Sequence, residues 1–162
     1  MIICGIVGLK NSGKTFLSQE LIKHFSSLSY KVASIKHAHH NFEIDTPNTD
    51  SFLHRQAGSS QVIISSSKRW AKISEIKDDQ EKKLEDLIDA FDSPDIVFFE
   101  GYKNSFYPKI EVISNPKKFL FPNLKNVIGI VSEFDLKVNL PVYKFSNLEN
   151  ISKLIIGINS NE

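Results

Sequence analysis

Apolar residues along the chain gather in short blocks of two kinds. Ile2–Val7 is a continuous apolar run, which is typical of a strand covered on both faces. From Lys14 to about Leu28 the apolar residues recur at helical spacing instead. The same criteria predict strands at Val32–Lys36, Gln61–Ser65, Trp70–Ile73, Ile96–Glu100, Ile110–Ile113, Val127–Val131 and Pro141–Tyr143, and helices at Thr49–Ala57, Asp79–Phe91 and Asn147–Ile158.

The order of these blocks predicts an α/β fold. Strands that alternate with helices favour a parallel sheet, and Val32–Lys36 should run parallel to Ile2–Val7. The short turn between Gln61–Ser65 and Trp70–Ile73 adds an antiparallel pair. Gly58 should end the helix before that pair, and Asn147 should cap the last helix. Asn115–Leu124 contains two prolines and is predicted to be an irregular connection. The aromatic residues predicted to lie in the core are Trp70, Phe91, Phe98 and Phe99.

The turn after the first strand carries the most specific motif. Residues 8–15 read GLKNSGKT and match G-x-x-x-x-G-K-[ST], the phosphate-binding P-loop, between a strand and a helix as the motif requires. Backbone amides of the loop can cradle phosphate, and the helix N-terminus favours anions. Lys14 would reach the outer phosphates and Thr15 would ligate Mg²⁺. The predicted nucleotide-binding residues are Gly8, Asn11, Ser12, Gly13, Lys14, Thr15 and Phe16.

A P-loop also needs an acidic group near the metal ion. Glu100 closes an apolar strand and is followed at once by Gly101, which permits a close approach of the backbone. We therefore predict Glu100, with Thr15, as a Mg²⁺ ligand, and Lys14 and Glu100 as the catalytic residues of a phosphoryl-transfer site. The expected fold is a P-loop NTPase three-layer sandwich, mainly parallel with additional antiparallel strands. Residues 1–162 should form a single nucleotide-binding domain.

The segment after Val32–Lys36 is polar and rich in histidine and aspartate. His37, His39 and His40 could suggest a metal site, but the spacings of zinc sites are absent, so a hydrogen-bonding or anion-contacting surface is favoured. Asp45 could reach Mg²⁺ through water or bind a substrate group. Lys36, His37, His54 and Arg55 could form a positive patch for a second phosphorylated ligand, or simply a solvated surface. The predicted substrate-binding residues are Lys36, His37, Asp45 and Arg55.

Composition narrows the function classes. Formal net charge is +1, so nothing general attracts the chain to nucleic acid or to an anionic membrane. No apolar run approaches membrane-spanning length, and no signal peptide is visible. The single cysteine, Cys4, lies in the first apolar run, which favours a buried thiol and a reducing cytoplasm. Three functions stay open at this point: a slow NTP hydrolase with an accessory role, a small-molecule kinase, and a non-hydrolysing nucleotide-binding module.

Several motifs together resemble the MobB family, the molybdopterin-guanine dinucleotide biosynthesis protein B family. They are the P-loop, residues 36–47 (KHAHHNFEIDTP), Asp50-Ser51, residues 54–58 (HRQAG), residues 100–103 (EGYK), residues 108–112 (PKIEV) and residues 140–142 (LPV). The match covers nearly the whole chain, and the KHAHHNFEIDTP block is much more specific than the P-loop alone.

The resemblance implies a GTP-binding homodimer with weak Mg²⁺-dependent GTPase activity. It also implies an accessory role in the guanine dinucleotide step of molybdenum cofactor biosynthesis, beside the guanylyltransferase MobA, with molybdopterin as a possible ligand. Lys14, Thr15 and Glu100 carry over by position. Ser132-Glu133 departs from the Thr-Asp pair usual in the family. If that Asp reads guanine, preference for this base is in question here, although a Glu133 carboxylate can still accept hydrogen bonds from the N1/N2 edge of guanine.

Overall fold

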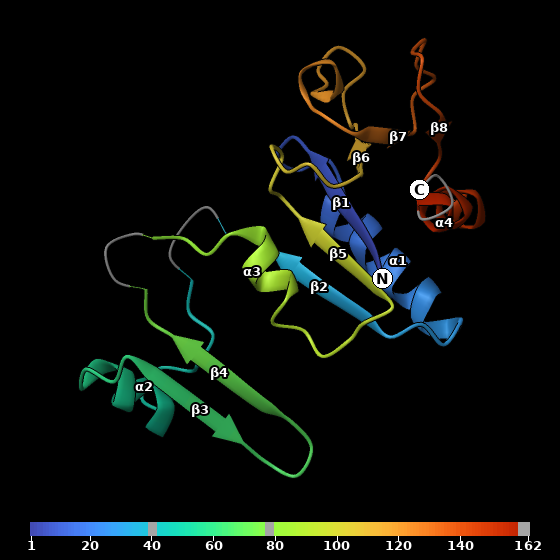
Figure 1. Cartoon of the computed structure of the whole chain (residues 1–162). Coiled ribbons are helices and arrows are strands. Elements are labelled where there is room, and N and C mark those ends of the chain that lie inside the picture. The colour runs from blue at the N-terminus through green and yellow to red at the C-terminus, as the bar shows by residue number, and fades with distance from the viewer. Residues whose placement is uncertain (39–41, 77–79, 159–162) are drawn as a thin grey trace. The chain divides into compact units, whose positions relative to one another are not determined.

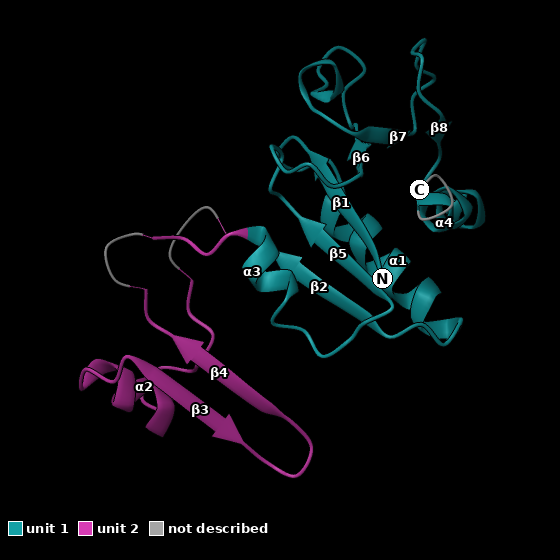
Figure 2. Cartoon of the chain, in the orientation of Figure 1, with its two compact units in different colours: residues 1–37, 84–162 teal, residues 38–83 magenta. Residues whose placement is uncertain are grey.

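The structure is a computed structural model that describes residues 1–38, 42–76 and 80–158. The chain divides into two compact units (Figure 2). The larger unit consists of residues 1–37 and 84–162, and the smaller one of residues 38–83. The expectation that all 162 residues act as one domain stays a prediction. No helix in the described part of the chain is both long enough and apolar enough to cross a membrane.

A six-stranded parallel sheet forms the centre of the larger unit (Figure 1). The strands lie in the order β2-β5-β1-β6-β7-β8. Their bounds are β1 Ile2–Gly8, β2 Val32–Lys36, β5 Ile96–Glu100, β6 Lys109–Val112, β7 Val127–Val131 and β8 Val142–Tyr143. The first two strands are parallel, as predicted, but β5 pairs with both and lies between them. The end of β5 is therefore next to the end of β1, where the P-loop begins.

Helices cover both faces of this sheet. Helices α1 (Lys14–Ser27) and α4 (Leu148–Ile156) contribute to the core on one face, and α3 (Leu84–Ile88) to the core on the other. Every fourth residue of α1 from Leu17 to Phe25 is fully buried, in line with the predicted amphipathic pattern. The buried apolar side chains of these helices are Leu17, Leu21, Phe25, Leu84, Ile88, Ile151 and Ile155. These layers confirm the predicted α/β sandwich.

Two predicted helices differ from the structure in detail. The helix expected at Asp79–Phe91 is five residues long and begins at Leu84, and residues 80–83 lie outside it. The side chains of those four residues end in polar or charged groups. A helical turn that does not pack against the rest of the protein is only marginally stable in water. Asn147 does occupy the N-cap position of α4, but its side-chain oxygen accepts from the Lys144 amide at 3.2 Å instead of from the helix. Asp79 lies outside the described residues.

The smaller unit contains helix α2 (Asp50–Gln56) and a hairpin of β3 (Gln61–Ser65) and β4 (Trp70–Ser74). The two strands are antiparallel, as predicted. Trp70 was predicted to lie in the core, and this is wrong: the side chain is 69% exposed. The alternation of apolar and polar residues in a hairpin identifies its apolar face. It does not say whether other residues bury that face.

Candidate functional site

The P-loop connects the end of β1 to the start of α1. Three of its residues have positive φ, namely Gly8 (151°), Asn11 (60°) and Gly13 (99°). A Cβ on Gly8 would lie 2.5 Å from the Val112 carbonyl oxygen and 2.6 Å from the Ser12 Oγ. The backbone conformation therefore favours glycine at both positions of the motif. At Gly8 there is also no room for a side chain. Helix α1 begins at Lys14, so the first backbone amides of the helix lie next to the loop. They favour the binding of an anion there.

The P-loop also contains the polar side chains of Lys14 and Ser12. The Lys14 ammonium donates to the Leu9 carbonyl at 2.7 Å. Burial lowers the pKa of Lys14, the Glu100 carboxylate opposes this, and the ammonium groups of Lys103 and Lys36 add to it. The Ser12 hydroxyl is buried and has no hydrogen-bond partner within the described residues. A buried hydroxyl without a partner is costly, which suits a loop that is completed by a ligand.

Thr15 and Glu100 come together across the end of the sheet. Glu100 is the last residue of β5 and is paired with Ile6 of β1. The Thr15 hydroxyl donates to the two carboxylate oxygens of Glu100 at 3.3 and 3.2 Å. Hydroxyl and carboxylate oxygens are ligands that Mg²⁺ accepts, together with phosphate oxygens and water. The residues present therefore fit a magnesium ion beside the phosphates.

The turn after Glu100 is tightly built. Gly101 has a φ of 100°, and a Cβ there would lie 2.6 Å from the Cβ of His37. The His37 amide donates to the Glu100 carbonyl at 2.9 Å, which continues the pairing of β2 with β5 past the last strand residue. The His37 ring stacks on Tyr102, with centroids 4.6 Å apart. A side chain on Gly101 would separate these parts.

On the other side of the loop, Phe145 packs against the P-loop and α1. Its ring meets Phe16 edge-on at 5.5 Å, and its Cζ would lie 3.0 Å from a Cβ on Gly13. The Phe145 amide donates to the Glu133 carboxylate at 3.1 Å, and Lys144 Nζ donates to the Glu133 carbonyl at 2.6 Å. One carboxylate oxygen of Glu133 is thus already used within the chain. Its contact with guanine stays a prediction.

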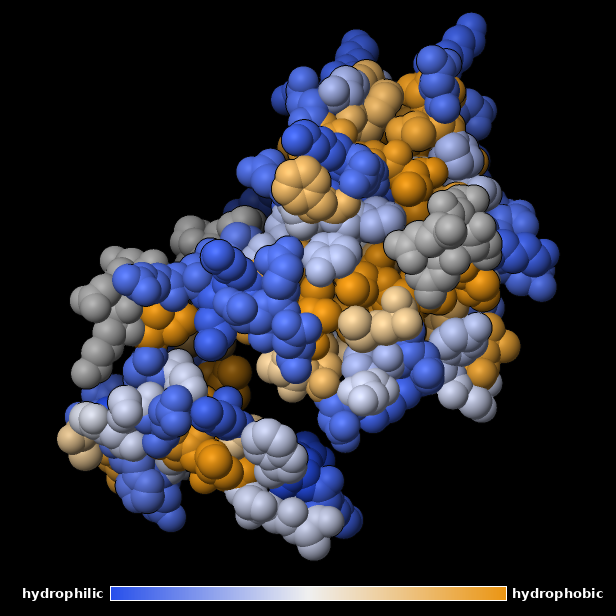
Figure 3. Space-filling view, in the orientation of Figure 1, coloured by the Kyte–Doolittle hydropathy of each residue, from blue (hydrophilic) through white to orange (hydrophobic). Residues whose placement is uncertain are grey.

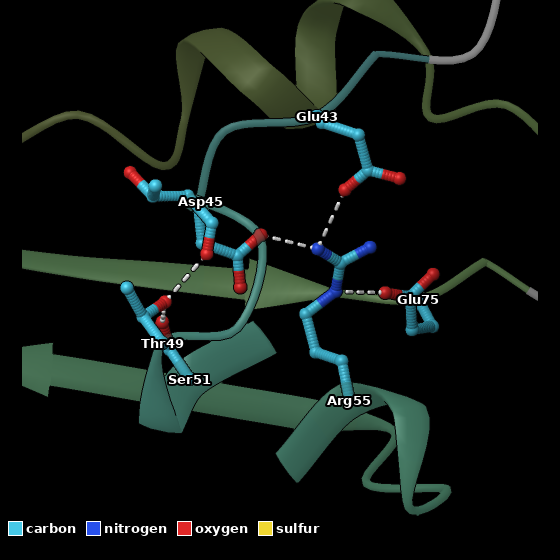
Figure 4. A network of polar contacts seen from close by, with 7 residues as sticks. Glu43, Asp45, Thr49, Ser51, Arg55 and Glu75 are labelled. Carbon is cyan, nitrogen blue, oxygen red and sulfur yellow. Dashed lines mark hydrogen bonds and ion pairs between the residues drawn. The ribbon is translucent and has the colours of Figure 1, made fainter. Parts of the chain in front are cut away.

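In the smaller unit, Arg55 is surrounded by carboxylates (Figure 4). Its guanidinium donates to Glu43 at 3.0 Å and also pairs with Asp45 and Glu75. Hydrogen bonds to Glu75 and Glu43 are the largest causes of a raised Arg55 pKa. Asp45 is buried, and its second oxygen has no hydrogen-bond partner among the described residues. Three carboxylates outnumber one guanidinium, so the charge of Arg55 is already neutralised.

The predicted substrate-binding residues therefore fall into two sets, one in each unit. Lys36 and His37 belong to the larger unit, and Asp45 and Arg55 to the smaller one. His54 is exposed on α2. His39 and His40 lie outside the described residues. Among residues 1–38, 42–76 and 80–158, no group of three or more His, Cys, Asp or Glu side chains could hold a metal ion.

Sequence reasoning did not assign a role to Lys103 or Glu111. Glu111 is buried in β6, where its carboxylate accepts from the Leu120 and Phe121 amides at 2.7 Å each. Burial raises the Glu111 pKa, while these two bonds lower it. The carboxylate of Glu111 between the apolar residues Ile110 and Val112 was a visible signal for a buried, hydrogen-bonded group. Lys103 follows Glu100 by three residues at the same edge of the sheet, and this position could have indicated from the sequence that Lys103 lies near the candidate site.

Comparison with known proteins identifies the family of this chain. The family described as "MobB: Molybdopterin guanine dinucleotide synthesis protein B" matches residues 3–133. The chain belongs to the MobB family. A molybdopterin-guanine dinucleotide biosynthesis adapter protein of Haemophilus influenzae is 31% identical over 156 residues, which cover 94% of this chain and 86% of that protein. The Escherichia coli protein of the same name is 28% identical over 152 residues, which cover 90% of this chain and 86% of that protein.

Solved MobB structures have the same fold. A crystal structure of molybdopterin-guanine biosynthesis protein B (mobB) superposes with a TM-score of 0.80 at 20% identity and covers 97% of this chain and 99% of that one. The MobB homologue from Bacillus stearothermophilus gives a TM-score of 0.77 at 18% identity and covers 99% of both chains. These likenesses show the MobB fold for this chain.

Proposed function

We propose that this chain is a GTP-binding accessory protein with weak Mg²⁺-dependent GTPase activity. It would act in the guanine dinucleotide step of molybdenum cofactor biosynthesis, beside a guanylyltransferase of the MobA type. The observation that carries the proposal is the contact of Thr15 with Glu100 next to the P-loop, because it supplies metal ligands where a triphosphate would end. The adapter names of the relatives support the accessory role.

Each part of the loop has a separate task in this proposal. The backbone of Gly8–Gly13 holds the phosphates, Lys14 neutralises their charge, and Thr15 and Glu100 hold Mg²⁺. When Mg²⁺ is bound it compensates charge on the phosphate oxygens. Because Glu100 ligates the metal, it does not serve as a general base for water. Turnover then rests on positioning and electrostatics alone, which favours slow hydrolysis.

Binding and hydrolysis of nucleotide test the proposal directly. Labelled GTP and ATP are titrated onto the protein with Mg²⁺, and phosphate release is followed without an acceptor. Slow release is expected, with GTP bound in preference to ATP. Phosphate transfer only in the presence of a small-molecule acceptor would favour a kinase, and tight binding without turnover would favour a non-hydrolysing module.

Two variants localise the activity. Lys14→Ala should abolish nucleotide binding and leave the fold intact, whereas the control Lys153→Ala removes an exposed lysine of α4, outside the loop, and should bind like the parent. Glu100→Gln should weaken Mg²⁺-dependent hydrolysis more than binding. Unimpaired binding of Mg²⁺-GTP by Lys14→Ala would show that the P-loop assignment is wrong.

We also propose that the protein is a homodimer and that the hairpin of the smaller unit takes part in the contact. In the β3–β4 register, Ile63 and Trp70 lie on the same face, and they are 64% and 69% exposed. Figure 3 shows apolar surface on this unit. A two-stranded hairpin is marginal in water without a cover, which a second copy would supply. Sedimentation equilibrium should give a dimer for the parent and a monomer for Trp70→Lys. Dimers of unchanged affinity in Trp70→Lys would exclude this face.

Molybdopterin, as a ligand of this protein or as cargo passed to the partner transferase, belongs to the same proposal. The free and buried Cys4 suits a reducing compartment, and we propose the cytoplasm.

A further inference from the structure

Two phenylalanine rings form an apolar corner beside the P-loop. Phe16 directly follows the last residue of the motif and is 54% exposed. Phe145 is partly buried, and the planes of the two rings meet at 65° with their centroids 5.5 Å apart. Phe145 also lies against Gly13 of the motif. Single exposed apolar residues are common on protein surfaces, but here two rings share one corner next to a predicted ligand site.

The chain around Phe145 fixes the position of this ring. The Phe145 amide donates to the Glu133 carboxylate at 3.1 Å, and the side chain packs against the core that α1 and α4 share. Glu133 belongs to the loop after β7, which is tied to β8 because the Ser132 amide donates to the Tyr143 carbonyl at 2.9 Å. The buried Ser132 hydroxyl donates to the Ile113 carbonyl, also at 2.9 Å. The ring is therefore held in place by its own chain, as expected for a built site.

The corner lies on the side of the loop away from the proposed metal ligands. Glu100 belongs to β5, which lies on one side of β1 in the sheet, whereas Phe145 follows β8, on the other side. In the proposed site, Thr15 and Glu100 hold Mg²⁺ at the terminal phosphates of the nucleotide. The nucleoside end of the same molecule then extends away from Glu100, toward the side on which Phe16 and Phe145 lie.

We propose that the rings of Phe16 and Phe145 hold the base of the bound nucleoside triphosphate. This inference rests on the proposed nucleotide site and adds two side chains that contact the base. Bases stack on aromatic rings through their faces, and such contacts depend little on which base is bound. The two rings therefore contribute affinity for GTP and for ATP alike, and a preference for guanine comes from polar groups at the edge of the base.

The test compares nucleotides with a ligand that has the phosphates but no base. Guanylyl and adenylyl imidodiphosphate, which are non-hydrolysable analogues of GTP and ATP, and inorganic tripolyphosphate are titrated onto the full chain by calorimetry with Mg²⁺. Phe16→Ala should weaken the binding of both analogues by the same factor, roughly ten- to a hundredfold, and leave the binding of tripolyphosphate unchanged. Phe145→Leu keeps an apolar side chain against the core and should give the same pattern.

A ring at the opposite edge of the sheet provides the matched control. Phe106 is 71% exposed, and its carbonyl accepts from the side chain of Asn126, which directly precedes β7. Phe106→Ala should therefore bind all three ligands like the parent. Circular dichroism of each variant verifies the fold.

A tryptophan at position 16 reports on the base directly. Phe16→Trp keeps an aromatic face and should retain affinity for the analogues. The fluorescence of its indole should fall when an analogue binds, because the base stacks on it, and should not fall when tripolyphosphate binds. The parent has Trp70 as its single tryptophan and gives the baseline.

Other outcomes would overturn the inference. Unchanged affinity of Phe16→Ala and Phe145→Leu for both analogues would show that the base binds elsewhere. Equal losses for the analogues and for tripolyphosphate would show that the rings support the loop and not the base. If the parent binds the analogues no more tightly than tripolyphosphate, the phosphate site stands and the base contact fails. If the parent binds none of the three ligands, the proposed function itself fails, and this inference fails with it.

Discussion

Gly101→Ala is the change that most directly tests the turn behind Glu100. An alanine at a φ of 100° has a strained backbone, which costs about 1–2 kcal/mol. Its Cβ would also lie 2.6 Å from the Cβ of His37, so the histidine must move. Loss of the His37–Tyr102 stack adds about 0.5–1.5 kcal/mol. We expect a decrease of about 2–3 kcal/mol in the free energy of unfolding.

Urea unfolding followed by circular dichroism measures this decrease. For an m-value of about 2 kcal/mol/M, the midpoint should fall by about 1–1.5 M. Gly58→Ala is the matched control, because Gly58 has a φ of 103° and open space around its Cβ position, so only the backbone strain applies. In a His37→Gly background the contact is absent, and Gly101→Ala should cost only about as much as Gly58→Ala. An equal cost of Gly101→Ala in both backgrounds would refute the steric argument.

Three further predictions concern buried groups. Glu111→Ala leaves two backbone amides without their acceptor and should lower the free energy of unfolding by roughly 2 kcal/mol, measured in urea; an unchanged midpoint would contradict this. Because burial raises the Glu111 pKa above its ordinary 4.5, its contribution to stability is present below pH 4.5 and is lost as pH rises through the raised pKa, so the stability advantage of the parent over Glu111→Gln should shrink upward from pH 4.5; a growing advantage would reverse the sign. Burial raises the pKa of Cys4 to about 12, so at pH 8 a disulfide reagent should label the thiol only as fast as the protein unfolds, and immediate labelling would rule out the buried thiol.

The sequence was most informative where chemistry and local structure coincide. The P-loop follows from the spacing of Gly8, Gly13 and Lys14 between a strand and a helix, and the structure places a strand, a turn with positive φ and a helix there. Glu100 was predicted to lie beside the P-loop because it ends an apolar strand, and β5 does lie next to β1. Both features depend on short stretches of chain, so local patterns are enough to find them.

The sequence was less informative where long-range packing decides. Nothing local says that β5 separates β1 from β2, or that Trp70 of the hairpin is exposed. Residues 80–83 have the charge pattern of a helix, but they are exposed and lie outside α3. Arg55 was expected in a positive patch because the carboxylates that surround it come from two separate segments, Glu43 with Asp45 before α2 and Glu75 after β4. Their meeting depends on the fold of the smaller unit.

The place of the smaller unit in the chain has a consequence for engineering. Residues 38–83 are inserted between β2 and β5, which are direct neighbours in the sheet. All six parallel strands and the P-loop come from the sequence on either side of this insertion. Replacing the insertion by a short glycine-serine connection would leave every strand pairing of the sheet in place. The result would be a minimal module in which the proposed nucleotide binding can be studied apart from the proposed assembly with other chains.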